Sequence, residues 1–116
     1  MAYSVYITTN STKSTLYVGV TNDIPSRICE HGLNAGKPET FAGRYSCYFL
    51  VYYEEYKYVN DAIQREKEIK KWRREKKEKL IATSNPAKEF LNENLGLYPF
   101  GDYADVRNIR NRRNTN

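Results

Sequence analysis

The sequence predicts a small α+β domain in which a three-stranded sheet is flanked by helices. Period-two alternation near the N-terminus and an apolar run at residues 48–54 indicate the strands. Helical spacing of apolar residues over 23–31 and after residue 61 indicates the helices. With 116 residues, the chain has enough length for one domain with a single modest core.

The first two strands follow one another closely. Residues 3–8 and 16–20 both alternate, and the polar turn between them predicts an antiparallel hairpin. One face of this hairpin takes the apolar residues Val5, Ile7, Leu16, Val18 and Val20. Because successive side chains point to opposite faces, Tyr6 and Tyr17 are expected to lie together on the other face.

A first helix is expected over residues 23–31, with Asn22 or Asp23 as its cap and Pro25 in its first turn. Four residues share one face of it by i, i+3 and i+4 spacing: Ile24, Arg27, Ile28 and His31. An arginine and a histidine are therefore expected beside core-facing isoleucines. Residues 32–43 form a predicted loop, and the third strand, 48–54, is apolar enough to be central in the sheet.

The second helix is expected from Asp61, with Asn60 as its cap, and should end or bend near Lys70. A further helical piece leads to Leu80 and Ile81, and Asn85-Pro86 opens a short amphipathic helix that ends at Gly96. The domain is assigned to residues 1–98. Residues 99–116 form a basic, Asn/Arg-rich tail that is expected to be disordered.

Composition narrows the functional classes. The chain carries 19 Lys and Arg against 14 Asp and Glu, and nine of the basic residues lie between residues 65 and 79, which fits an anionic partner such as nucleic acid. No run approaches the roughly 18 apolar residues of a membrane span, and no signal peptide is visible, so a cytoplasmic protein without a membrane partner is expected. Two cysteines and one histidine without ligand spacing argue against zinc.

Glu66 is the least expected residue of its helix, because it falls within the apolar arc of Ala62, Ile63 and Ile69. A carboxylate there costs several kcal/mol unless it is paired, hydrogen-bonded or bound to a metal ion. The pattern leaves two interpretations open: an i,i+4 ion pair with Lys70, or a ligand for Mg²⁺. Arg27 likewise either packs its stem or offers its guanidinium to a phosphate.

Taken singly, Tyr6 and Tyr17 fit ordinary sheet tyrosines, and His31 fits a structural histidine. Together with Arg27 and Glu66 they supply what phosphodiester hydrolysis needs. These needs are an activated nucleophile, charge neutralisation on the phosphate and help for the leaving oxyanion.

The chain also resembles a known family, the GIY-YIG endonuclease superfamily, over about residues 3–92. Ser4-Val5-Tyr6 looks like the GIY element and Tyr17-Val18-Gly19 like the YIG element. Arg27 stands where the family has its catalytic arginine, and His31 where a His or Tyr is common. Glu66 looks like the metal-binding glutamate, and Asn85 like the asparagine that often completes the site. The likeness is greatest to small stand-alone bacterial members, which are similar to the N-terminal nuclease domain of the excision-repair incision subunit.

This resemblance implies a three-stranded antiparallel sheet flanked by helices and hydrolysis of DNA with one Mg²⁺ or Mn²⁺ ion on Glu66. It implies that Tyr17 is the general base or its close partner, while Tyr6 orients the water or shares that role. Two positions depart from the family pattern. Ser4 replaces the first glycine, and Val20 stands where many repair-type members have a lysine.

The resulting prediction is a structure-selective DNA endonuclease linked to repair or recombination, without an organic cofactor. The residues expected to bind substrate are Lys70, Arg73, Arg74, Lys77 and Asn85. One alternative is a nucleic-acid-binding module that does not cut. Another is an interaction module for a repair-protein partner, with the basic run as a solvated helix face. The DNA structure recognised and the oligomeric state are left open.

Overall fold

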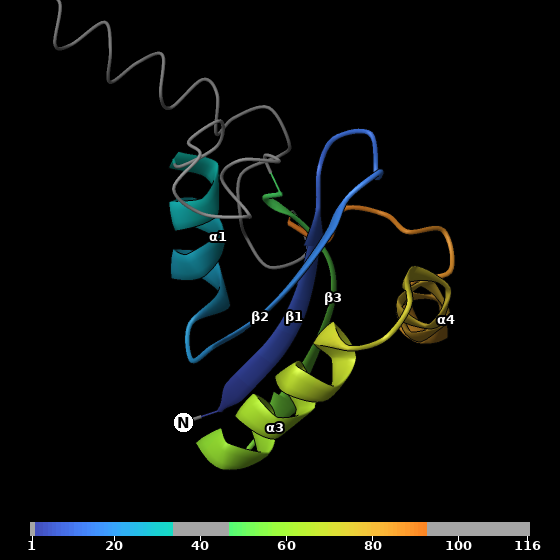
Figure 1. Cartoon of the computed structure of the whole chain (residues 1–116). Coiled ribbons are helices and arrows are strands. Elements are labelled where there is room, and N and C mark those ends of the chain that lie inside the picture. The colour runs from blue at the N-terminus through green and yellow to red at the C-terminus, as the bar shows by residue number, and fades with distance from the viewer. Residues whose placement is uncertain (1, 34–46, 93–116) are drawn as a thin grey trace, which may run out of the picture.

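The computed structural model of the protein describes residues 2–33 and 47–92. It confirms the predicted α+β class with a three-stranded antiparallel sheet. The elements are β1 (Tyr3–Thr9), β2 (Leu16–Thr21), α1 (Ile24–Leu33), β3 (Phe49–Tyr56), α3 (Val59–Lys70) and α4 (Arg74–Ser84), as Figure 1 shows. The predicted loop was wrong at residues 32 and 33, which belong to α1. Residues 34–43 of that loop, the domain boundary and the tail lie outside the described residues.

The strand order is β2-β1-β3, with both pairings antiparallel. The central strand is therefore β1, and the expectation that the third strand is central was wrong. Strand β3 is nevertheless buried over Phe49 to Tyr52, because part of its outer edge is covered by the chain that follows α4.

This cover consists of hydrogen bonds from residues 85–92 to β3. The backbone N–H of Leu91 donates to the Leu50 carbonyl at 2.7 Å, and the Leu50 N–H donates to Asn92 Oδ1 at 2.8 Å. Asn85 Nδ2 donates to the Val51 carbonyl at 2.9 Å, beside an irregularity in the β1–β3 register. The expected helix from Asn85 was wrong over residues 85–92, because these groups bond to the strand instead of forming a helical turn. Gly96 lies outside the described residues.

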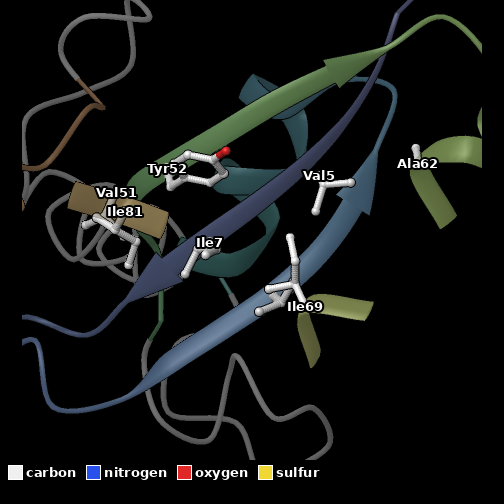
Figure 2. Close-up of a cluster of buried hydrophobic side chains, with 8 residues drawn as sticks. Val5, Ile7, Val51, Tyr52, Ala62, Ile69 and Ile81 are labelled. Atoms are coloured by element: carbon white, nitrogen blue, oxygen red, sulfur yellow. The ribbon is translucent and has the colours of Figure 1, made fainter. Parts of the chain in front are cut away.

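The two faces of the sheet carry separate cores. Helix α1 lies on one side, and α3 and α4 lie on the other (Figure 1). Figure 2 shows the second side, where Val5, Ile7 and Val51 meet Ile69 of α3 and Ile81 of α4. The core under α1 instead contains Tyr6, Ile24, Ile28, Tyr48, Phe49 and Leu50, with Tyr17 packed against it. The alternation predicted for the hairpin is thus confirmed.

The two C-terminal helices begin and end close to the predicted places. Helix α3 starts at Val59, so its cap position is Tyr58 and not Asn60, and no side chain caps it. It ends at Lys70 as expected, and α4 is the predicted second piece. Within residues 2–33 and 47–92, no helix has the length and apolar character that crossing a membrane requires.

Candidate active site

The site begins with a buried pair between β1 and α1. Tyr6 is only 1% exposed, and its hydroxyl lies 2.8 Å from Nε2 of His31, which faces inward from the last turn of α1. Residues 24, 28 and 31 all turn toward the sheet, as their helical spacing predicted. The Tyr6 ring is therefore fixed at both ends, by the strand that carries it and by the histidine that bonds its hydroxyl.

Gly19 makes room for this ring. It lies directly across from Tyr6 in the β1–β2 register. A Cβ atom added at Gly19 would stand 2.5 Å from Cζ of Tyr6, far inside van der Waals contact. The phenol ring therefore lies across a backbone position that only glycine can occupy without displacing it.

Tyr17 completes an aromatic cluster on the same face. Its ring centroid is 6.2 Å from that of Tyr6 and 5.3 Å from that of His31, with an edge-on arrangement to the histidine. Unlike Tyr6, it is only partly buried, because it lies on the edge strand β2. Tyr17 is thus the more exposed tyrosine of the pair.

Burial keeps both members of the inner pair neutral, and the nearby Arg27 cation adds to this effect for His31 alone. Burial, followed by the Arg27 charge, lowers the pKa of His31 to about 4. Burial, followed by the neighbouring Tyr17, raises the pKa of Tyr6 well above its ordinary value. Near neutral pH the pair is therefore an uncharged imidazole bonded to an uncharged phenol.

Arg27 stands at the rim of this cluster. Its side chain is 43% exposed and its guanidinium lies 3.3 Å from the Glu30 carboxylate. The sequence expectation that it lies beside the core-facing isoleucines was wrong in that respect, because the helix turns this position toward solvent. Its charge still reaches Tyr6 and His31.

The buried histidine makes a stability prediction. The pKa of His31 is about 4 in the folded protein, whereas its ordinary value, which applies to the unfolded chain, is 6.5. Between these two pH values the unfolded chain therefore binds more protons than the folded protein. The neutral His31 therefore makes its full contribution to the free energy of unfolding above about pH 6.5. This contribution, up to about 3 kcal/mol, is lost as the pH falls toward 4. We expect His31→Gln to unfold with a flatter pH dependence in this window. Urea unfolding of both proteins at several pH values between 4 and 7 measures it, and parallel curves would contradict it.

Glu66 reaches the same region from the other side of the sheet. Its side chain is 12% exposed, and one carboxylate oxygen lies 2.8 Å from Nζ of Lys70. That ammonium also lies 6.0 Å from the centroid of the Tyr17 ring. The i,i+4 pair left open by the sequence is therefore present, and Lys70 connects Glu66 with the tyrosine cluster around the edge strand.

A hollow of about 280 Å³ opens at this edge. It is lined by Leu16, Tyr17, Val18, Lys70 and Lys77. Two lysines and a tyrosine thus border one space beside two aliphatic side chains, and the paired cations can attract an oxyanion there.

The side chains available as metal ligands near Glu66 determine which metal ion the site fits. The described residues hold no group of three or more His, Cys, Asp or Glu side chains that could bind a metal ion. Zinc, which takes three or four protein ligands, does not fit Glu66 alone. Magnesium does fit, because it commonly binds one or two carboxylates and completes its shell with water and phosphate oxygens.

Other residues expected to bind substrate have different positions. Arg73 is exposed and Lys77 lines the hollow. Arg74, however, bonds the carbonyls of Ser14 and Lys13 in the β1–β2 turn, the latter at 2.7 Å, and pairs with Glu78. The side chain of Asn85 is buried and bonds the backbone of Val51 and Glu89. In the structure, Arg74 and Asn85 therefore bond neighbouring backbone segments and help to hold the fold together.

The sequence reasoning assigned no role beside the tyrosines to two of their neighbours, Thr8 and Gly19, although it named Gly19 as part of the YIG element. Thr8 is fully buried opposite Tyr17, and its hydroxyl has no hydrogen-bond partner in the part of the chain that the structure describes. Gly19 lies opposite Tyr6. Counting the hairpin register outward from the turn would have found both, since Thr8 and Gly19 share the tyrosine face by period two.

Comparison with known proteins gives a consistent picture. Residues 2–79 match the model of a family described as "GIY-YIG catalytic domain". A UPF0213 protein of Haloquadratum walsbyi is 40% identical over 76 residues, which cover 66% of this chain and 82% of that one. A UPF0213 protein of Staphylococcus haemolyticus is 38% identical over 68 residues, 59% and 80% of the two chains.

One solved structure is also similar. The solution NMR structure of a UPF0213 protein from Bacillus halodurans shares 30% identity. The likeness covers 73% of this chain and 87% of that one, with a TM-score of 0.46.

Proposed function

The chain belongs to the GIY-YIG family, and on that premise we propose that it is a divalent-metal-dependent endonuclease that hydrolyses DNA phosphodiester bonds. The observation that carries the proposal is the meeting of two groups at the β2 edge. The aromatic cluster of Tyr6, Tyr17 and His31 comes from one side of the sheet, and the Glu66–Lys70 pair comes from the other.

Tyr17 is proposed as the group that takes the proton from the attacking water. Tyr6 is almost completely buried and its pKa is raised, so its phenol neither reaches a substrate nor ionises readily. Tyr17 borders the hollow. A general base must lie within hydrogen-bond reach of the proton that it abstracts, and accessibility therefore favours Tyr17.

Tyr6 and His31 then act as positioning residues. Their hydrogen bond fixes the Tyr6 ring, and that ring packs against Tyr17. Holding the base in one orientation raises the rate because little reorganisation is needed when the reaction occurs.

The cations have the complementary task. Arg27 at the rim and Lys77 in the hollow can bind the non-bridging oxygens of a phosphate. Glu66 would hold Mg²⁺ or Mn²⁺, and when bound such an ion supplies Lewis-acid polarisation of the phosphate. Tight charge neutralisation of this kind is the largest contribution in many phosphoryl-transfer reactions.

We further propose that the enzyme selects its substrate by the shape of the DNA. Its proposed biological role is in DNA repair or recombination. The hollow lies on an open sheet edge and presents charges and a phenol, which recognise a phosphate backbone without reading bases. A structure-selective enzyme acts at branches, flaps or nicks, where a strand can approach such an edge.

A cleavage panel tests the proposed function. Branched, flapped, nicked, single-stranded and duplex DNA are incubated with the full chain and Mg²⁺, Mn²⁺ or EDTA. We expect cleavage of at least one branched or flapped substrate with a divalent ion and none with EDTA. Absence of cleavage on every substrate with both ions would favour the non-cleaving binding module.

The exposed basic residues around α4 make a separate binding prediction. If Arg73 contacts a phosphate, Arg73→Ala should reduce the slope of log affinity against log salt by about 1, whichever DNA sequence is used. Lys57→Ala, which removes an exposed charge before α3, is the matched control and should leave the slope unchanged. Fluorescence anisotropy between low and moderate salt gives both slopes. Equal slopes for all three proteins would assign Arg73 to a solvated helix face.

A further inference from the structure

We propose that Lys70 is a built-in counter-cation that occupies the cation position at Glu66 until a divalent metal ion displaces it. The inference rests on the proposed function, because it assumes that Glu66 is the metal ligand. It goes further by assigning Lys70 a role in controlling when the metal binds.

Glu66 and Lys70 are buried to very different extents. Glu66 is 12% exposed and Lys70 is 51% exposed, although their charged groups lie 2.8 Å apart. A carboxylate removed from water to this extent needs a compensating cation, and Lys70 supplies it from one helical turn away. The Glu66 carboxylate belongs to a short, mostly buried side chain, whereas the ammonium ends a flexible four-carbon stem.

The ammonium of Lys70 has a second favourable position beside Tyr17 and the hollow. Its Nζ lies 6.0 Å from the Tyr17 ring centroid, and its side chain lines the hollow together with Tyr17 and Lys77. A lysine that leaves Glu66 can therefore enter a space where a ring face and an incoming phosphate oxygen both attract a cation. The exchange keeps every charge compensated.

This arrangement links the metal to the substrate. A divalent ion must compete with the ammonium for the carboxylate, so the protein alone should bind the ion weakly. An oxyanion in the hollow draws Lys70 away from Glu66 and thereby strengthens metal binding. Linkage requires the converse as well, since an ion on Glu66 frees Lys70 to bind the oxyanion more tightly.

The test measures Mn²⁺ binding to the full chain by isothermal titration calorimetry without DNA. We expect Lys70→Gln to bind Mn²⁺ about tenfold more tightly than wild type, because a competing charge beside the carboxylate is gone. Lys70→Arg, which keeps the charge, should stay within about threefold of wild type. Lys67→Gln removes an exposed charge from the same helix and should change the affinity less than about twofold. Glu66→Gln should abolish the binding in every background.

Several results would overturn the inference. Equal or weaker Mn²⁺ binding by Lys70→Gln would do so, and so would an equal gain in Lys67→Gln, which would indicate a general charge effect. Absence of Glu66-dependent binding in both wild type and Lys70→Gln would also overturn it. These results concern Mn²⁺ affinity without DNA, whereas the cleavage panel measures product formation. Cleavage that occurs while the Mn²⁺ result fails would overturn this inference and leave the proposed function standing.

Discussion

Gly19→Ala is expected to lower the free energy of unfolding by about 2 kcal/mol and the rate of DNA cleavage by about a hundredfold. The added methyl would stand 2.5 Å from Cζ of Tyr6, whose side chain is buried, so the ring must move. Displacement of the ring breaks the hydrogen bond to His31 and removes the surface against which Tyr17 packs. Urea unfolding and single-turnover cleavage measure the two effects.

A double-mutant cycle with Tyr6 isolates the cause. Tyr6→Leu removes the ring that the new methyl would strike, at its own loss of stability and activity. In that background Gly19→Ala should add little to either loss. If the alanine lowers stability equally with and without the ring, the effect belongs to the backbone of β2 and not to the contact between Gly19 and Tyr6.

Glu66→Gln is expected to reduce Mg²⁺-dependent cleavage at least about a thousandfold, because it removes the only carboxylate proposed to hold the metal ion. DNA affinity without a divalent ion should change less than about threefold, since the charges proposed to bind phosphate remain. Glutamine keeps the shape of the side chain. Cleavage time courses and anisotropy on the same substrate provide the comparison.

Glu68→Gln is the matched control for this substitution. It lies on the same helix and carries the same charge, but its side chain is 53% exposed and pairs with Arg65. It should retain cleavage within about twofold of wild type. If both glutamine variants lose activity equally, the loss reflects the charge of α3 and not a metal ligand at Glu66.

The sequence predicted the parts of this arrangement that depend on local periodicity. Alternation in the hairpin placed Tyr6 and Tyr17 on one face, and helical spacing turned His31 toward the sheet. Glu66 stood out because a carboxylate is costly on an apolar face. The structure shows the expected pair with Lys70, and the metal-ligand role of Glu66 stays a prediction. These inferences need only the geometry of one strand or one helix.

The failures depend on contacts between distant segments. The edge position of β3 is tolerable because Leu91 and Asn92, about 40 residues later, bond Leu50. The same contacts replace the helix expected from Asn85. Arg74 bonds the β1–β2 turn some 60 residues earlier, a contact that the sequence did not reveal, and its expected role in binding substrate stays a prediction. No local pattern reveals which partner a polar side chain will find across the fold.

The most direct test of the central claim is single-turnover cleavage started by adding Mg²⁺ to a preformed complex of the protein with flapped or branched DNA. Wild type, Tyr17→Phe and Glu66→Gln are compared at protein concentrations that saturate the DNA. The account predicts nicked product from wild type, none with EDTA, and at least about a hundredfold slower product formation from each variant. Product formation by Glu66→Gln at the wild-type rate, or none from wild type with any divalent ion, would contradict it.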